Sequence, residues 1–277
     1  MKFRSLKAIV LISLFSPFIS AAGAPSCDQL QNIAKEETIN GQSKIPTSPF
    51  VVAAKNRVYF HTAPDSSCKQ LDKFVIAGDY LYAYKIHEGF TYVNYFTAKG
   101  NEVKGWVNSS ELKNFNPATT TSLKNNLNIS DFIVMSNNDW FGLGDSFSNS
   151  PSLSKNHELS SEFIGDFPND IGGLDKFYSH TYKDYSVISS NVNYDKRLWS
   201  IDDDYIISNI TLTTPKYHTI RNIRVGDKKE DVLNKYNGIK PTESKSKITY
   251  DLGEMSLTFN LIKDVISSIE MSSIPEQ

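Results

Sequence analysis

Short apolar runs separated by turn residues dominate the stretch from Arg57 to Leu112. Tyrosine occupies every second position from Tyr80 to Tyr84, and aromatic residues recur through 90–96. Alternation of this kind is typical of strands that turn one face toward a core. Because several such runs follow one another at short intervals, the pattern predicts a small antiparallel β-barrel at 50–114.

The motifs of this predicted barrel resemble those of bacterial SH3-like domains. Such domains open with a valine, a strand and a turn ending in Ala-Pro or Gly-Pro, bend again at Gly-Asp or Gly-Lys, and close with Gly-Trp-Val ahead of a leucine. The matching residues are Val58 to Pro64, Gly78-Asp79, Gly105-Trp106-Val107 and Leu112. Tyr59-Phe60-His61 stands where Arg-Ser-Gly usually follows the first valine. The resemblance implies an SH3-like fold, and some of these domains bind cell-wall peptide.

The C-terminal region shows one arrangement twice. Each copy has a Gly-Asp pair, then a polar or helical segment, then alternating strands, of which the last contains Ile-x-x-Ile. The Gly-Asp pairs are Gly144-Asp145 and Gly226-Asp227. This self-similarity predicts a diverged tandem repeat, with units at 127–216 and 217–277. The segment 115–126 is rich in Thr, Ser and Asn and is expected to link the barrel to the first unit.

The second unit has the clearer pattern. Asp227 is expected to cap a helix together with Glu230, and Gly238 to end it. Strands are expected at 247–251, 256–260 and 265–271. The first unit has no clear helix signal after Asp145, because Ser146–Asn156 is rich in Ser and Asn.

This helix-then-sheet unit, with its Val225–Val232 signature, resembles the repeat of beta-lactamase inhibitor proteins and the small lipoproteins of the outer-membrane barrel-assembly machinery. Those relatives bind other proteins and catalyse no reaction. The expected fold class is therefore mainly β with an α+β C-terminal region: an SH3-like β-barrel followed by two related helix-plus-antiparallel-sheet units.

The first residues have the organisation of a secretory signal peptide. Lys2, Arg4 and Lys7 precede the apolar segment Ala8–Ser20, and small residues follow at 21–24. The apolar segment is shorter than the roughly 20 residues that a membrane-spanning helix needs. We expect removal of 1–23, an N-terminal arm and linker at 24–49, and a periplasmic or secreted protein without a transmembrane span.

The chain has two cysteines, Cys27 and Cys68. In an oxidising compartment two cysteines are expected to pair, which predicts a Cys27–Cys68 disulfide. Such a bond would tie a short helix, expected at 28–37 from its apolar spacing, to the barrel. Two unpaired thiols, or a lipid anchor on Cys27, are the alternatives.

Charge narrows the class of partner. The chain has 29 basic and 31 acidic side chains, and three of the basic ones lie in 1–24, which has no acidic residue. Removal of that segment leaves a formal net charge of about −5. This balance argues against nucleic acid or an anionic lipid surface as the main partner.

Candidate chemistry is sparse. The histidines His61, His87, His157, His180 and His218 show no zinc-binding spacing. Asp202-Asp203-Asp204 offers carboxylates for a divalent cation but lacks the calcium-loop pattern, so a solvated turn is the simpler interpretation. Gly144-Asp145-Ser146 is similar to a hydrolase block with Ser146 as nucleophile, yet no βαβ alternation surrounds it. We therefore expect no catalytic residue, cofactor or metal.

Aromatic residues are the candidates for partner binding. Tyr80, Tyr82 and Tyr84 share one strand face, which is either barrel core or an exposed aromatic strip. Trp199 and Tyr205 are the anchors expected in the first repeat. The repeat sheets are expected to bind through the face turned away from the helix. The residues expected on that face are Tyr205, Ser208, Thr211, Thr258, Asn260, Ser267 and Glu270.

Three functions remain open at this stage. The first is a non-enzymatic protein-binding module, an inhibitor or immunity-type protein that acts on an envelope-targeted enzyme or toxin. The second is a cell-wall protein whose SH3-like domain holds peptidoglycan. The third is a hydrolase with an unrecognised site.

Overall fold

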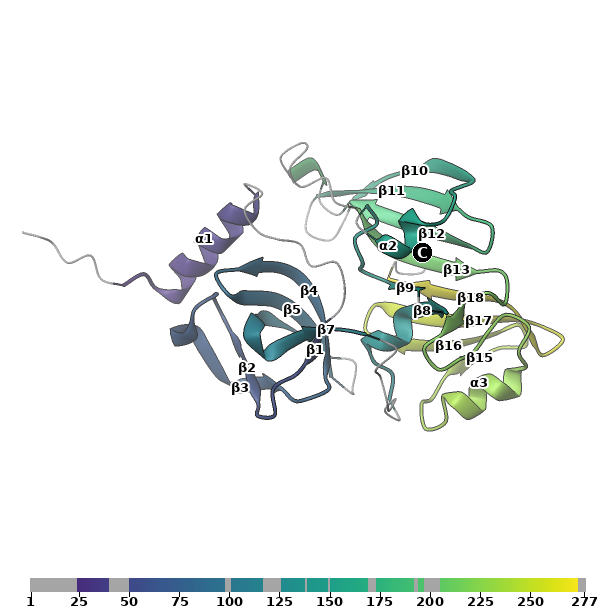
Figure 1. The fold of residues 1–277 in the computed structure, drawn as a ribbon, viewed down its shortest axis with the longest axis horizontal. Coiled ribbons are helices and arrows are strands. Elements are labelled where there is room, and N and C mark those ends of the chain that lie inside the picture. Colours follow the sequence, from purple (N-terminus) through teal and green to yellow (C-terminus); the bar gives the residue numbers. More distant parts are fainter. Residues whose placement is uncertain are drawn as a thin grey trace, which may run out of the picture.

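A computed structural model describes residues 24–39, 50–97, 101–116, 126–137, 139–148, 150–168, 173–191, 194–196 and 205–273. In this part the protein is mainly β, with three antiparallel sheets and few helices, as the alternating patterns predicted (Figure 1). The expected signal peptide at 1–23, the acidic run at 202–204 and Trp199 lie outside the described residues.

The N-terminal sheet has seven strands in the order β3-β2-β6-β5-β4-β1-β7. Apolar residues of its strands, among them Phe60, Leu81 and Val93, are buried in a core of their own. The strands are β1 (Phe50–Val52), β2 (Val58–His61), β3 (Lys69–Val75), β4 (Tyr80–His87), β5 (Phe90–Phe96), β6 (Glu102–Asn108) and β7 (Leu112–Asn114). They occupy the segment where the sequence predicts a barrel.

The C-terminal region is built on an eight-stranded sheet in the order β10-β11-β12-β13-β18-β17-β16-β15. β13 and β18 therefore pair at its centre, and three further strands follow outward on each side. The strands are β10 (Ser160–Pro168), β11 (Leu174–Thr181), β12 (Tyr185–Asn191), β13 (Ile206–Leu212), β15 (Thr242–Glu243), β16 (Lys247–Leu252), β17 (Met255–Ile262) and β18 (Val265–Ser272). The three strands expected near the C-terminus are confirmed, each slightly longer than expected.

Smaller elements complete the fold. A three-stranded sheet has the order β14-β8-β9, with β8 at Ile133–Ser136, β9 at Asp139–Gly142 and β14 at His218–Thr219. The helices are α1 (Cys27–Ile39), α2 (Pro151–Ser154) and α3 (Lys229–Lys235), and short 3₁₀ turns are η1 (Ser66–Cys68), η2 (Ser109–Glu111), η4 (Ile129–Phe132) and η5 (Tyr194–Lys196). Residues of β8, β9, α2 and α3 share one core with the eight-stranded sheet.

Two details of the helices differ from expectation. α3 begins at Lys229, with Lys228 as its N-cap and the Asp231 carboxylate accepting from the Lys228 N at 3.0 Å. Asp227, the expected cap, instead closes the preceding turn by accepting from the Arg224 N at 2.7 Å. The Ser/Asn-rich segment after Asp145 does contain a short helix, α2, because the Ser150 hydroxyl caps it and a proline occupies its first turn.

A Gly-Asp turn is bonded to the last strand in both halves of the eight-stranded sheet. In each half the glycine N donates to an isoleucine carbonyl, and the same isoleucine N donates back to the aspartate carbonyl, at 2.8 or 2.9 Å. The residues are Gly144, Asp145 and Ile207 in the first half and Gly226, Asp227 and Ile266 in the second. Both glycines have positive φ, 79° and 97°, which explains why glycine stands there.

Both of these last strands also have a bulge at the equivalent place. Ser208 is the extra residue of β13 opposite β12, and Ser267 is the extra residue of β18 opposite β17. Each bulged serine directly follows the isoleucine that bonds the Gly-Asp turn. The two halves thus agree in turn geometry, in bulge position and in strand order outward from the centre.

The seven-stranded sheet packs against the C-terminal core. Tyr80 and Tyr82 of β4 are partly buried against that core, and a Cβ on Gly144 would lie 2.9 Å from the Tyr82 ring. Phe115 is 3% exposed, and its ring lies 5.3 Å from that of Tyr80 and 5.6 Å from that of Trp140. The start of the expected linker is therefore an apolar bridge between the two parts.

Candidate binding surface

Every strand of the eight-stranded sheet contributes one residue to a polar row that crosses the sheet from edge to edge. The strand registers place these residues directly opposite one another, so their side chains project from one face. Seven are serine or threonine, and the eighth, near the centre, is glutamate. In spatial order they are Ser160, Thr181, Ser186, Thr211, Glu270, Thr258, Thr249 and Thr242.

The face that carries the polar row, called the open face below, is opposite the face that packs on the core. Neighbours of the polar row along the strands, such as Tyr185, Leu212, Leu257 and Ile269, are at most 2% exposed and belong to the core. Side chains alternate between the two faces of a strand. The predicted outward positions Thr211, Thr258 and Glu270 are therefore on the open face, although Thr258 is only 6% exposed. Ser208, also expected to face outward, is instead the bulge residue of β13 and is 3% exposed.

Hydrogen bonds between neighbouring strands hold the polar side chains of the open face. Asn209 Nδ2 donates to Glu270 Oε1 at 2.9 Å, and Thr211 Oγ1 donates to Asn209 Oδ1 at 3.2 Å. The Thr249 and Thr258 hydroxyls are 3.0 Å apart. Ser186, Thr211 and Glu270 remain partly exposed. The open face thus presents short, positioned hydroxyl and amide groups around the Glu270 carboxylate, which suits a polar, hydrated protein interface.

The predicted aromatic candidates have different surroundings. Tyr80 and Tyr82 are neither in the core of the seven-stranded sheet nor fully exposed, because they pack partly buried against the C-terminal core; partner binding through them stays a prediction. Tyr84 lies in β4, and its side chain is outside what the structure describes, as is the whole of Trp199. Tyr205 is partly exposed just before β13, 5.6 Å from the Tyr178 ring.

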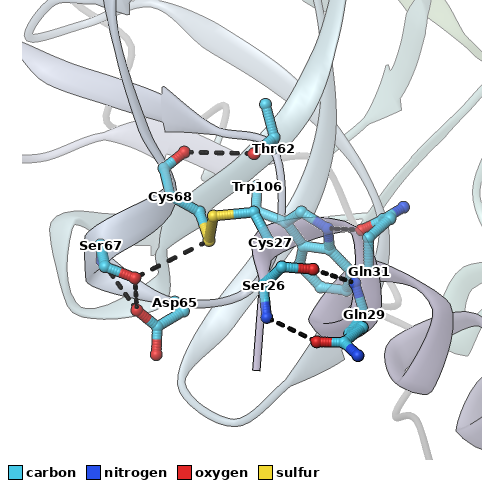
Figure 2. The surroundings of a disulfide bond; sticks show 9 residues. All are labelled: Ser26, Cys27, Gln29, Gln31, Thr62, Asp65, Ser67, Cys68 and Trp106. Atoms are coloured by element: carbon cyan, nitrogen blue, oxygen red, sulfur yellow. Dashed lines mark hydrogen bonds between the residues drawn. A yellow bond between two sulfur atoms is a disulfide. The ribbon is translucent and has the colours of Figure 1, made fainter. Parts of the chain in front are cut away.

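The predicted disulfide is present between Cys27, at the start of α1, and Cys68 of η1. Figure 2 shows Trp106 next to this bond, with Gln31 of α1 turned toward the indole. The Trp106 Nε1 donates to Gln31 Oε1 at 2.5 Å, and Trp106 is 0% exposed. The expected helix after the cysteine is confirmed as α1. The bond and the Gln31 contact together fix that helix on the seven-stranded sheet.

Trp106 belongs to an aromatic cluster. Its ring lies 5.2 Å from that of Tyr92 and 6.2 Å from that of His87, and Lys85 Nζ lies 5.0 Å from its centroid. Burial lowers the pKa of Lys85, and Lys35 of α1 adds to that effect by charge repulsion. α1 therefore lies over aromatic residues of the sheet, with Lys35 of the helix and Lys85 of β4 close to one another.

A carboxylate, an imidazole and a hydroxyl form a chain in the C-terminal region. His180 Nδ1 is 2.7 Å from Glu158 Oε1, and His180 Nε2 is 2.8 Å from Ser189 Oγ. The same order of groups activates the serine of hydrolases. However, Ser189 is 1% exposed, so a substrate carbonyl does not reach its hydroxyl in this structure. No sequence signal marks the three residues, because strand pairing alone brings them together.

The sequence candidate for a nucleophile, Ser146, is 2% exposed, and an isolated bridge pairs it with Ile206. The neighbouring Asp145 carboxylate accepts from the Gly142 N at 2.8 Å. Burial raises the pKa of Asp145 to about 8, and the Gly142 hydrogen bond opposes this rise. His180, with its ring stacked 4.0 Å from that of Phe147, is bonded to Glu158 and Ser189 rather than to Ser146.

Within the described ranges, no three His, Cys, Asp or Glu side chains gather as a metal-binding group. None of the helices in that same part of the chain has the length and apolarity needed to cross a bilayer. No family model matches the chain, and neither a curated protein nor a solved structure matches it.

Proposed function

We propose that the protein is an exported, non-enzymatic protein-binding module, an inhibitor or immunity-type protein that acts on an envelope-targeted enzyme or toxin. Its recognition surface is the open face of the eight-stranded sheet. The expected signal peptide at 1–23 and the pairing of Cys27 with Cys68 support export, because disulfides persist in oxidising compartments.

The polar row is the observation that carries this proposal. Seven of the eight residues in the row are Ser or Thr, and six of the eight are exposed or partly exposed, whereas Thr249 and Thr258 are at most 9% exposed. Short hydroxyl side chains lose little conformational entropy when a partner covers them. Their donors and acceptors fit a wet interface in which water fills the remaining gaps. Tyr205 is partly exposed and contacts Tyr178, which belongs to the core-packing face, so the proposed surface does not include it.

The fold-level expectations support the same proposal. We propose that the seven-stranded sheet at 50–114 is the SH3-like barrel and that 127–216 and 217–277 are two related units. In support of the second point, Gly144-Asp145 and Gly226-Asp227 make matching bonds, and Ser208 and Ser267 form matching bulges. Proteins with a resembling repeat bind other proteins, which agrees with a recognition role for this region.

The test combines partner capture with variants of the open face. The mature full-length protein is used to isolate its partner from an envelope extract, and the dissociation constant is then measured by calorimetry. Thr211→Arg and Ser186→Arg each place a long charged side chain in the polar row. Loss of shape complementarity there is expected to weaken binding by about tenfold or more, equivalent to about 1.4 kcal/mol.

The matched control is Asn114→Arg, which adds the same side chain to an exposed position of β7 in the other sheet. This control is expected to bind like the parent protein. If Asn114→Arg binds more weakly while both open-face variants bind normally, recognition belongs to the seven-stranded sheet. Sedimentation of the protein with purified cell-wall sacculi, in place of a stoichiometric protein partner, would support the cell-wall alternative.

A further inference from the structure

One edge of the eight-stranded sheet is long, apolar and exposed. β10 is the terminal strand of the sheet order, and its only strand neighbour among the described residues is β11. It has nine residues, all exposed apart from Gly165. Large apolar side chains on and beside this strand are Leu159 (60% exposed), Phe163 (55%), Ile164 (45%) and Phe167 (39%). Exposed apolar groups together with unpaired strand amides form a template for another strand.

Other sheet edges of this protein are protected in the ways that proteins commonly use. β15, at the opposite edge of the same sheet, has only two residues and directly follows Pro241. β3, an edge of the seven-stranded sheet, carries Lys69 and Lys73. Short strands, proline and lysine each disfavour strand addition. β10 has neither lysine nor arginine, and its proline, Pro168, is at its very end.

The aromatic residues of β10 already pack against aromatic residues of the neighbouring strand β11. Phe163 packs on Tyr178 with ring centroids 5.3 Å apart, and Phe167 packs on Phe177 at 5.8 Å. Phe163 pairs with Tyr178 on one face of the sheet, whereas Phe167 contacts Phe177 on the other. An added strand would therefore find an apolar shelf on both faces, where alternate side chains of an extended segment can pack.

Charge determines which kind of strand fits. Glu162 and Asp166 are the charged side chains of β10 itself, and both are exposed. A bulge at Ile164 places them on opposite faces of the sheet, and Asp166 Oδ2 accepts from the Tyr194 hydroxyl at 2.9 Å. Asp175 lies opposite Phe167 on β11, which adds a further carboxylate next to the C-terminal part of the edge. Lys176, opposite Asp166, supplies a single positive charge from the neighbouring strand. A second copy of β10 would bring its own acidic pair toward this one, and facing like charges destabilise strand pairs.

We propose that β10 binds an extended segment of the partner protein as an added edge strand, and that this segment carries basic residues alternating with apolar ones. The inference rests on the proposed protein-binding function. Main-chain hydrogen bonds would supply affinity, while Glu162 and Asp166 would select lysine or arginine on the incoming strand.

The probe is a synthetic peptide with the length of β10 in which lysine alternates with valine, and binding to the full-length protein is followed by fluorescence anisotropy. A glutamate–valine peptide of equal length tests charge, and a lysine–valine peptide with alternate N-methylated amides tests strand pairing. Only the unmodified lysine–valine peptide is expected to bind. Its affinity is expected to fall about tenfold or more in Glu162→Lys/Asp166→Lys, because the lysine face of the peptide meets one of these two positions in either orientation, and attraction there becomes repulsion.

Glu243→Lys on β15 is the matched control, because it changes the same charge on an exposed residue of the other edge strand. It is expected to leave peptide binding unchanged. Glu162→Gln/Asp166→Asn provides a neutral second variant with the same side-chain sizes, and circular dichroism verifies that each variant is folded.

Equal binding of the lysine–valine peptide by the parent and the charge-reversed variant would overturn the inference, as would binding of the N-methylated peptide. A concentration-dependent dimer in analytical ultracentrifugation that Glu162→Lys/Asp166→Lys alters would assign the edge to a second copy instead. Failure of all peptides to bind would reject the β10 site alone, because Thr211→Arg and Ser186→Arg test the open face independently.

Discussion

Thr211 of β13 lies directly opposite Glu270 of β18, and this pair marks the centre of the eight-stranded sheet. On one side the polar row continues through Ser186, and on the other through Thr258. The row therefore has hydroxyl groups on both sides of a single carboxylate. Glu270 is the one residue of the polar row that is not Ser or Thr, so it is the first target for mutation of the open face.

Replacement of Glu270 is expected to show how much its hydrogen bond to Asn209 contributes to the free energy of unfolding. Asn209 is only 7% exposed, so its amide has little access to water. Glu270→Leu removes the acceptor of the Asn209 amide and is expected to lower the free energy of unfolding by about 1–3 kcal/mol. Glu270→Gln keeps an acceptor oxygen and is expected to change stability by less than about 0.5 kcal/mol. Urea denaturation of both variants measures the difference. Equal losses would show that the bond contributes nothing.

Removal of the disulfide is expected to destabilise the N-terminal part. Cys27 and Cys68 are separated by 41 residues in sequence, and closure of such a loop corresponds to at most about 4 kcal/mol of chain entropy. Cys27→Ser/Cys68→Ser is therefore expected to shift the urea midpoint downward. Intact mass after alkylation without reduction provides the check on the bond itself. Two alkylated thiols in the native protein would contradict the pairing.

Trp106→Ala is expected to lower the free energy of unfolding by about 3–5 kcal/mol, because it removes a fully buried side chain and leaves a cavity. Trp106→Phe retains most of the apolar volume but loses the donor to Gln31, so a smaller loss is expected. Leu71→Ala, at a position that is 76% exposed, is the control and is expected to have little effect. A melting temperature for Trp106→Ala equal to that of the control would refute the packing argument.

Arg221 and Asp131 form a buried, bidentate ion pair, with Arg221 Nε 2.6 Å from Oδ1 and Nη2 3.1 Å from Oδ2 of the carboxylate. The pair connects residues far apart in sequence and is at most 7% exposed. Arg221→Met leaves the carboxylate buried without its partner, which is expected to cost about 3–5 kcal/mol.

Two further variants test this ion pair by urea denaturation. Arg221→Met/Asp131→Leu is expected to recover part of the loss in a double-mutant cycle, because no lone charge remains buried. Arg224→Met, which removes a partly exposed arginine that donates to the Pro215 carbonyl, is the control and is expected to lose less than Arg221→Met. Additive losses in the cycle would show that the two side chains do not interact.

Asp145 is expected to make stability fall with rising pH. Burial raises its folded-state pKa from 3.8 to about 8. Between these two values the folded state keeps a proton that the unfolded state has lost, so the free energy of unfolding decreases as pH rises through this range. Below it both states are protonated and the group has no effect.

Asp145→Asn keeps the side chain neutral at every pH and is expected to reduce this decrease. Thermal unfolding at about pH 5 and about pH 8 compares the variant with the parent protein. Asp227→Asn, in the matching but less buried turn, is the control. The loss of stability between the two pH values is expected to be smaller for Asp145→Asn than for the parent protein, and this difference is expected to exceed that between Asp227→Asn and the parent protein. The reverse order would contradict the assignment.

Local patterns in the sequence determined the elements and the crosslink. Alternation indicated β4, β5 and the three last strands, because a strand with one buried face must place apolar residues at every second position. The expected signal peptide and the count of two cysteines were sufficient to predict the pairing of Cys27 with Cys68. The Gly-Asp turns were visible because glycine adopts a positive φ without steric cost and therefore recurs in such turns. Each of these signals depends only on residues close together in the chain or on simple counting.

The tertiary structure alone decided which strands became neighbours. Nothing local to β13 indicates that it pairs with β18, so the polar row, with Thr211 opposite Glu270, could not be read along the chain. The same holds for the Glu158–His180–Ser189 chain and for the burial of Asp145, which come from packing between distant segments. Strand pairing and burial depend on long-range contacts, and alternation specifies only which residues share a face, not what that face meets.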